Sequence, residues 1–425
     1  MRSGTAPSGL RYAVRRSASS VGWCALSIRC GTRDEAGFRG GIAHFTEHTI
    51  FRGTKRKSAS VIGSYLDRLG GELNAYTTKE EIVLHATVLK EDLGKAARLL
   101  FELATEPTFP DDEIETERGV VLDEIISYKD NPVEDVYDKF EGMLFEGHPL
   151  GNPILGTTAS VRRITPEDLR RFVRTFFTPD RMAFTVVADI DEIVLEKRVL
   201  RLAEKLFGGS DFSTRPDGLG RNDRIVISSE GEAGVEKSAW PQPFDKTVDK
   251  RNHEVNAVIG NRAPSLYEEE DRITAAVLCN ILGGPASNSL LNKELREKNG
   301  WVYGVECSYT QYADTGIAAI SFGCDKPNLE RCLKALDKIL EHLREVPLSE
   351  RFLKAAKRQL LGQLAISSAS GEAQCLSMGK SLLSWGRIDS SAETRARIEA
   401  VTPGALQAMA RRLFDPASLS RLIYL

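Results

Sequence analysis

The sequence has little of what marks several classes of protein. Among 425 residues there is no run of about 18 apolar residues, so no membrane-spanning helix is expected. The formal net charge is only −3, which provides no basic field to attract nucleic acid. The seven cysteines, scattered from Cys24 to Cys375, include no CxxC pair, which argues against a disulfide framework. With 41% hydrophobic and 28% charged residues, the composition predicts a soluble globular protein in a reducing environment.

The N-terminus has no acidic residue before Asp34 and is rich in Arg and Ser, as an organelle transit peptide is. However, residues 10–16 and 22–30 have the composition of two strands joined across a Ser-rich turn, which would form the first hairpin of the fold. We therefore expect a cytoplasmic protein whose mature chain keeps this segment. The alternative is the mitochondrial matrix.

Two stretches of the chain repeat one plan. Residues 164–187 and 401–425 align without a gap, and Thr165 and Thr402 each provide an N-cap oxygen before a proline. The same offset of 237 residues relates the segments that begin at Pro110 and Pro347. This duplication predicts an α+β fold of two homologous domains, each a mainly antiparallel sheet with helices packed on one face. We place the domains at residues 1–206 and 245–425, with a linker at 207–244 that is rich in Gly, Pro and Asp.

Two of only six histidines lie in the stretch 40–54, "GGIAHFTEHTIFRGT". Its apolar spacing predicts a helix, so His44 and His48, four residues apart, project from one face with Glu47 beside them. Two imidazoles one turn apart can occupy adjacent corners of a zinc tetrahedron, and the Glu then lies within reach of a metal-bound water. The alternative is a surface helix that happens to carry two histidines.

A hydrolytic zinc site needs a third protein ligand, and residues 115–130 offer two glutamates on one helical face. Glu117 and Glu124 are seven residues apart. We expect Glu124 to be the ligand and Glu117 to orient a ligand or the neighbouring helix. Asp123, which points about 100° away, is the rival ligand. For both glutamates the alternative is a solvated helix face.

The repeat favours chemistry over packing for these residues, because the second copy lacks them. At the offset of 237, the positions of His44, Glu117 and Glu124 are taken by other residues, namely Ile281, Lys354 and Leu361. A feature needed only for folding would tend to recur in both copies.

At these residues the chain resembles the inverted-motif zinc peptidases of the pitrilysin, insulysin and mitochondrial processing peptidase group. The resemblance also includes "FRGTKRKSA", "LDRLGGELNAYTTKE", "HPLGNPILG" and "LREKNGWVYGV", and so spans most of the chain. It implies Zn2+ held by His44, His48 and Glu124, with Glu47 as general base on zinc-bound water. The spacing from His48 to Glu124 is one residue shorter than the family's. Residues 282–291 lack its Ser-Ser-Arg pattern.

The resemblance further implies residues that bind the substrate. Arg296 and Tyr303 are similar in position to a pair that contacts the substrate carbonyl and the reaction intermediate, and both side chains are suitable oxyanion donors. Asn74 and Ala75 resemble an edge strand that binds an extended peptide by main-chain pairing.

The resemblance also implies an assembly, because the family builds a closed chamber from four such domains and this chain has two. Arg296 and Tyr303 of one protomer would complete the zinc site of another. A symmetric homodimer suffices for this arrangement, and a heterodimer is possible.

The sequence therefore predicts a zinc-dependent metalloendopeptidase acting on oligopeptides or extended segments. The main alternative is a catalytically inactive peptide-binding or assembly subunit with the same fold. A third possibility is a hydrolase that uses the same zinc on small non-peptide substrates.

Overall fold

A computed structural model of the chain describes residues 1–208 and 240–425, which form two sheets. We call these two ranges the N-terminal half and the C-terminal half. The N-terminal sheet has the order β1-β2-β6-β3-β5-β4, with β1 (Arg2–Thr5), β2 (Arg11–Arg16), β3 (Val21–Ile28), β4 (Glu72–Thr77), β5 (Ile82–Leu89) and β6 (Met182–Ala188). The C-terminal sheet has the order β7-β11-β8-β10-β9, with β7 (Asp245–Val248), β8 (Val255–Ala263), β9 (Val302–Gln311), β10 (Gly316–Cys324) and β11 (Ser420–Tyr424).

The two sheets share one topology. In each, a single parallel pair, β2 with β6 or β7 with β11, is followed by antiparallel strands in the same order. The N-terminal sheet has β1 in addition, and it pairs antiparallel with β2. The prediction of two homologous, mainly antiparallel α+β domains is therefore confirmed.

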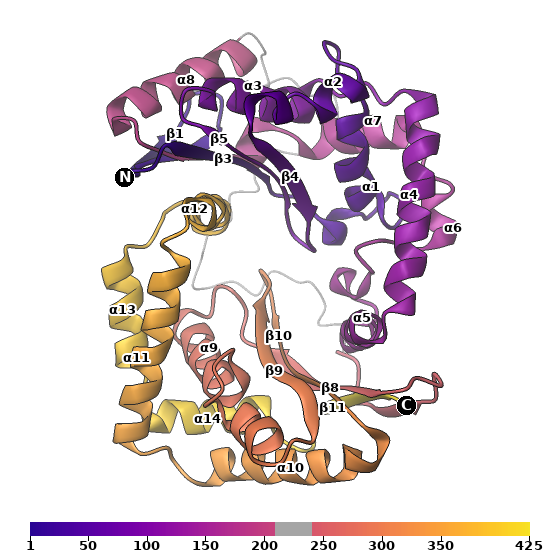
Figure 1. Cartoon of the computed structure of the whole chain (residues 1–425), viewed down its shortest axis with the longest axis vertical. Helices are drawn as coiled ribbons and strands as arrows, with labels where there is room; N and C mark the ends of the chain where they lie inside the picture. The colour runs from indigo at the N-terminus through magenta and orange to yellow at the C-terminus, as the bar shows by residue number, and fades with distance from the viewer. Residues whose placement is uncertain (209–239) are drawn as a thin grey trace.

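Most helices also recur in the same order in the two halves (Figure 1): all but α2 and α8 of the N-terminal half have an α-helix at the corresponding place in the C-terminal half. The N-terminal half has α1 (Ile42–Thr49), α2 (Ala59–Gly63), α3 (Leu93–Thr105), α4 (Asp111–Asp130), α5 (Pro132–Leu144), α6 (Thr158–Val161), α7 (Pro166–Phe176) and α8 (Glu192–Phe207). The C-terminal half has α9 (Glu269–Gly283), α10 (Leu329–Glu345), α11 (Glu350–Ser367), α12 (Gly371–Trp385), α13 (Ser391–Ala400) and α14 (Pro403–Leu413). Helices α7 and α14 begin and end 237 residues apart, and the threonine before each, Thr165 or Thr402, caps its helix as predicted.

The two halves exchange one helix each, which the sequence did not predict. Helix α12 packs on β3 and β6 of the N-terminal sheet, whereas α5 packs on β8 and β11 of the C-terminal sheet (Figure 1). The fit of α12 depends on small residues: a Cβ at Gly371 would meet the ring of Trp23 at 2.3 Å, and one at Gly379 would meet Ser27 Oγ at 2.4 Å. Each sheet is thus covered on its second face by a helix from the other half.

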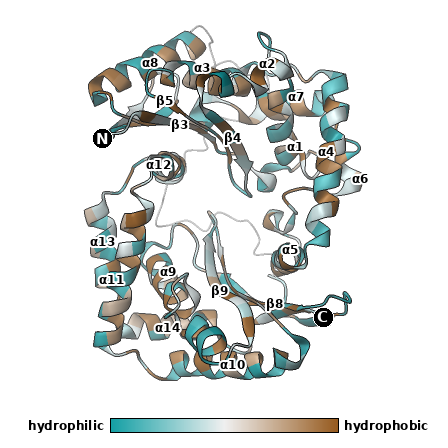
Figure 2. Cartoon of the chain, viewed as in Figure 1, coloured by the Kyte–Doolittle hydropathy of each residue, from teal (hydrophilic) through white to brown (hydrophobic). Residues whose placement is uncertain are grey.

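Buried apolar side chains fill the layers between sheets and helices. Figure 2 colours the ribbon by hydropathy and shows hydrophobic residues on the strands and helices of both halves. One core cluster lies between the N-terminal sheet and its own helices, and a second lies in the C-terminal half. Two smaller clusters lie under the exchanged helices α5 and α12. No helix within the described ranges has the length and apolar character needed to cross a membrane.

The predicted N-terminal hairpin is wrong, although both of its strands exist. Strand β6 lies between β2 and β3, parallel to the first and antiparallel to the second. The reason is burial: all seven residues of β6 are buried, so this apolar strand gains most from a central position. The Arg/Ser-rich segment itself supplies β1 and β2.

The boundaries predicted for the domains stay predictions, because the predicted linker at 207–244 lies mostly outside the described residues.

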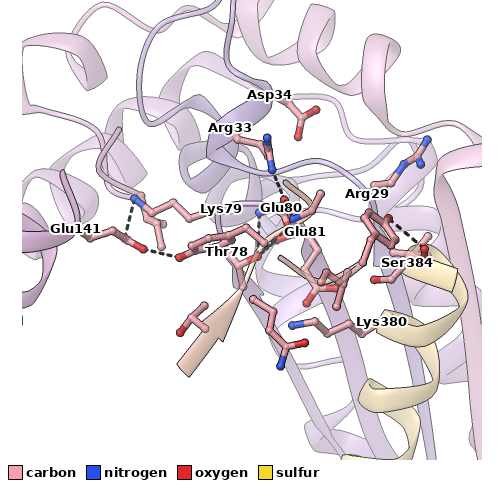
Figure 3. Close-up of a pocket in the computed structure, with 18 of the residues that line it drawn as sticks. Arg29, Arg33, Asp34, Thr78, Lys79, Glu80, Glu81, Glu141, Lys380 and Ser384 are labelled. Carbon is pink, nitrogen blue, oxygen red and sulfur yellow. Dashed lines mark hydrogen bonds and ion pairs between the residues drawn. The ribbon is translucent and has the colours of Figure 1, made fainter. Parts of the chain in front are cut away.

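Two equivalent hairpin tips join the halves. Glu80, in the turn after β4, accepts the Ala313 N–H of the turn after β9 at 3.0 Å and pairs with Arg33. Arg33 also binds Asp314, at 2.7 Å. A cavity of about 590 Å3 lies beside this junction, and Figure 3 shows Arg33 beside Glu80 and Lys79 beside Glu141 in its wall. The Arg33–Asp314 ion pair and the hydrogen bond from Ala313 to Glu80 therefore connect the two halves at this junction.

Candidate metal centre

Helix α1 carries both histidines of the motif on one face. The centroids of the rings of His44 and His48 are 4.5 Å apart. His44 is buried, with 6% of its surface exposed, and Glu47 and His48 are partly buried. The predicted helix is therefore present, and its two imidazoles face the same space.

Glu124 on α4 completes a three-residue cluster with the two histidines. Its Oε2 lies 3.7 Å from His44 Nε2 and 3.4 Å from His48 Nε2. One ligand atom from each residue falls within 4.8 Å of the others. Asp123, the rival ligand, is exposed and does not belong to this cluster.

The cluster fits a divalent metal ion. Two imidazole nitrogens and one carboxylate oxygen are a donor set that zinc uses in catalytic sites, with a further position left for water. Glu124 Oε2 is buried and has no hydrogen-bond partner in the described part of the chain, a costly state for a carboxylate oxygen unless a cation compensates it.

Glu117 contacts His48, a proposed metal ligand, but does not belong to the three-residue cluster itself. Its Oε1 lies 2.8 Å from His48 Nδ1, and its Oε2 forms an ion pair with Arg52. Burial raises the pKa of Glu117, but the hydrogen bond to His48 and the charge of Arg52 outweigh it, and the net pKa is lowered. The ionised carboxylate accepts the Nδ1 proton and leaves His48 Nε2 facing Glu124.

The two imidazoles differ in basicity. Burial lowers the pKa of His44 to about 4, so this ring is neutral at pH 7 and available as a ligand. Burial also lowers the pKa of His48, but its hydrogen bond to Glu117 and the charges of Glu47 and Glu124 raise the net value to about 9. Metal binding at His48 must therefore displace a proton.

Glu47 lies beside the cluster with its carboxylate held by a neighbouring strand. Thr77 Oγ1 on β4 donates a hydrogen bond to Glu47 Oε2 at 3.4 Å. Burial raises the pKa of Glu47. A raised pKa brings a carboxylate closer to the range in which a general base is most effective at neutral pH.

A cavity of about 510 Å3 opens over the cluster. Its wall contains His44, Glu47, His48, Ala75, Tyr76, Thr77, Glu124 and Tyr128, together with residues 153–157. Strand β4 lies at the edge of its sheet, so one side of its backbone is free to pair. Ala75 is in the cavity wall, whereas Asn74, next along the strand, is exposed outside it.

The structure does not bring Arg296 and Tyr303 to this cavity. Arg296 lies in the π-helix η6 (Asn292–Lys298) of the C-terminal half. Tyr303, on β9, has 57% of its surface exposed, and its hydroxyl donates a hydrogen bond to Asp325 Oδ1 at 2.8 Å. Their predicted role at the zinc site of another protomer stays a prediction.

Glu35 is a residue of this centre that sequence reasoning missed. It is 4% exposed, and its carboxylate accepts the backbone N–H groups of Gly41 and Ala43 at the start of α1. Burial raises its pKa to about 7, against the effect of these two hydrogen bonds. The one signal in the sequence is that α1 begins after glycines, which provide no capping side chain.

Comparison with known proteins places the chain in a family. Residues 12–158 match the family model described as "Insulinase (Peptidase family M16)", and residues 163–360 match "Peptidase M16 inactive domain". An "uncharacterized zinc protease" of Streptomyces coelicolor is 30% identical over 97% of this chain and 86% of the relative. An "uncharacterized zinc protease" of Bacillus subtilis is 30% identical over 91% of this chain and 89% of the relative. The chain belongs to peptidase family M16.

Two solved structures show the same fold. A protease from Helicobacter pylori aligns with a TM-score of 0.86 at 20% identity, covering 100% of this chain and 98% of that one. A protein from Pseudomonas fluorescens, titled "peptidase M16 inactive domain", aligns with a TM-score of 0.85 at 19% identity, covering 100% and 97%. The resemblance inferred from the sequence is thus confirmed in family and fold.

The predicted zinc cofactor agrees with the names of these relatives and with the His-His-Glu donor set. The relatives are bacterial, which gives no support to a mitochondrial location; a cytoplasmic location stays a prediction. The family model described as inactive covers α9 and α11 up to residue 360, and it includes Ile281 and Lys354, which stand at the offset of 237 from His44 and Glu117.

Proposed function

We propose that this M16 family member is a zinc-dependent endopeptidase that cleaves oligopeptides or extended, unfolded segments. The observation that carries the proposal is the convergence of His44, His48 and Glu124 around one point with Glu47 beside it. In the proposal, the first three residues hold the metal. Zinc, when bound, supplies a Lewis acid that polarises the substrate carbonyl and acidifies water.

The other residues have separate tasks in this proposal. Glu47 removes a proton from the attacking water and later delivers it to the leaving amine, as a general base and acid. Thr77 orients its carboxylate, and Glu117 fixes the tautomer of His48. The free edge of β4, with Asn74 and Ala75, binds the peptide backbone as an added strand, so the preferred substrate is extended.

The proposal includes a homodimer, because Arg296 and Tyr303 lie away from the cluster of their own chain. As donors to the developing oxyanion they would act on the zinc site of a partner. An inactive peptide-binding or assembly subunit is the competing hypothesis. The complete set of four side chains in the N-terminal half argues against it, because a subunit without catalysis has no need for a general base beside a metal cluster.

The test combines metal analysis with cleavage of a quenched peptide. We expect about one zinc per chain and cleavage that a chelator abolishes. Glu47→Gln should keep the metal and lose roughly 10²–10⁴-fold in kcat, the usual contribution of a general base. Asp123→Asn is the matched control, because this acid is next to Glu124 but exposed, and it should cleave as wild type.

Three results would decide against the proposal. Equal rates for Glu47→Gln and wild type would remove the general base. A zinc-loaded wild type that cleaves no peptide but binds peptides would favour the inactive subunit, and activity on small esters alone would favour a non-peptide hydrolase.

A further inference from the structure

Helix α1 begins with an unusual cap. The first N–H groups of a helix have no partner within it and are commonly satisfied by a side chain at the N-cap. The N-cap here is Gly41, which has no such side chain. Glu35, six residues earlier, provides the acceptors instead: its Oε2 accepts the Gly41 N–H at 2.9 Å and its Oε1 accepts the Ala43 N–H at 3.0 Å.

The packing around Gly41 explains why the cap comes from elsewhere. Gly41 has φ 86°, in the left-handed region, and a Cβ there would meet Leu155 O at 2.7 Å and Gly156 Cα at 2.9 Å. Serine, threonine or aspartate at this N-cap would therefore be strained and would clash. Because residues 153–157 also form the wall of the metal cavity, this close contact fixes the start of α1 against the site.

Both hydrogen bonds of Glu35 lie immediately before the proposed metal ligands. His44 follows Ala43 directly, and Glu47 and His48 come within the next turn of a helix of eight residues. A rotation or a shift of this short helix displaces all three side chains together. Misplacement of reacting groups by about 1 Å can cost 100-fold in rate.

The C-terminal half has no equivalent of this arrangement. There the matching helix, α9, extends over 15 residues and starts with three acidic residues of its own, Glu269, Glu270 and Asp271. A buried carboxylate reaching the helix from a preceding loop is found only in the half that carries the metal cluster. Its restriction to that half points to the site rather than to the shared fold.

We infer that Glu35 is a positioning residue of the metal centre, whose buried carboxylate holds the first turn of α1 and thereby aims His44, Glu47 and His48. It touches neither substrate nor metal. This inference rests on the proposed function for its effect on cleavage, but its effect on metal binding stands independently.

The test uses Glu35→Gln in the full-length protein. Glutamine has the same size as glutamate, but only one of its two terminal atoms can accept a hydrogen bond. Its NH2 group would therefore face a backbone N–H without binding it. We expect zinc affinity, measured in competition with a chromophoric chelator, to fall 10- to 100-fold. We expect kcat to fall by a similar factor with KM within about twofold, because the peptide-binding strand β4 is not involved. The absorption spectrum of the cobalt-loaded protein should change, since it reports ligand geometry without turnover.

The matched control is the neighbouring Asp34→Asn. Asp34 Oδ2 also accepts a backbone N–H, that of Gly31 at 3.0 Å, but this bond caps η1 (Thr32–Asp34) and not α1. Asp34→Asn should keep the wild-type cobalt spectrum and kcat. Should Glu35→Gln fail to fold, Glu35→Asp keeps the carboxylate on a shorter stem and should give an intermediate metal affinity.

Two outcomes would overturn the inference: wild-type metal affinity and kcat in Glu35→Gln, or the same loss in Glu35→Gln and Asp34→Asn, which would indicate a general effect of loop stability. If the wild type cleaves no peptide while Glu35→Gln still loses metal affinity and alters the cobalt spectrum, the proposed function fails and the role of Glu35 stands.

Discussion

The two halves of the chain have one topology and different chemistry. Five strands and the helices from α3 to α7 recur in order as β7 to β11 and α10 to α14, yet only the N-terminal half has the metal cluster. In the C-terminal half, α9 and α11 take the places of α1 and α4 in the order of elements. At the offset of 237, Ile281, Lys354 and Leu361 stand where the N-terminal half has His44, Glu117 and Glu124. The C-terminal half thus forms the same fold without a His-His-Glu cluster. The presence of this cluster in the N-terminal half is therefore explained by chemistry and not by folding.

Among the predictions that compare the two halves, the largest effect tests whether the C-terminal half contributes to the chemistry of a partner. Tyr303→Phe removes one proposed oxyanion donor and should lower kcat by roughly 10²–10³-fold. Mixing it with Glu47→Gln should restore up to about one quarter of wild-type activity in a homodimer with sites completed in trans, because half of the mixed dimers' sites then carry neither lesion. The measurement is peptide cleavage after the two variants are unfolded and refolded together.

The control for this prediction is Tyr309→Phe, on the same strand β9. The Tyr309 hydroxyl donates to Pro264 O at 2.6 Å, within the C-terminal half, so its loss should leave kcat unchanged. No recovery in the mixture, with dimers present, would mean that Tyr303 acts within its own chain or not at all.

A smaller effect is expected from substituting Glu117 on α4, and Lys354 at the equivalent position of α11 provides the comparison. Glu117→Gln weakens the acceptor that holds His48 Nδ1, and we expect metal affinity to fall by about 10- to 100-fold. Lys354→Gln, at the equivalent position of the exposed face of α11, should change nothing. Zinc competition titrations measure both, and equal affinities for the two variants would remove Glu117 from the site.

What the sequence could predict of the site follows from helical periodicity. His44 and His48 lie one turn apart, and Glu117 and Glu124 two turns apart, so each pair lies on one face whatever the rest of the fold does. Glu35 escaped prediction because its partners are backbone N–H groups, which carry no signature in the sequence, and because the contact depends on the path of the loop before α1.

The same contrast holds for the fold. The repeat and its Thr-Pro caps are local patterns and were predicted with the correct offset. The insertion of β6 between β2 and β3, and the exchange of α5 and α12, were not, because an apolar strand or an amphipathic helix shows that it is buried but not against which partner. Long-range pairing is decided by the packing of the whole chain.

The smallest effect is expected from the packing of the two exchanged helices. Here we compare a glycine on α12 with a glycine on α5. Gly371 of α12 leaves no room for a methyl group beside the ring of Trp23, whereas a Cβ at Gly142 of α5 would meet its nearest neighbour, Gly151 O, at 3.4 Å, an ordinary contact. Gly371→Ala should therefore destabilise the protein by about 1–3 kcal/mol through overpacking. Gly142→Ala should be neutral or stabilise it by up to about 1 kcal/mol, because alanine favours the helix. Urea unfolding of the two variants measures the difference, and equal midpoints would mean that α12 adjusts on its sheet as freely as α5, so that the close fit to Trp23 does not determine how the halves are joined.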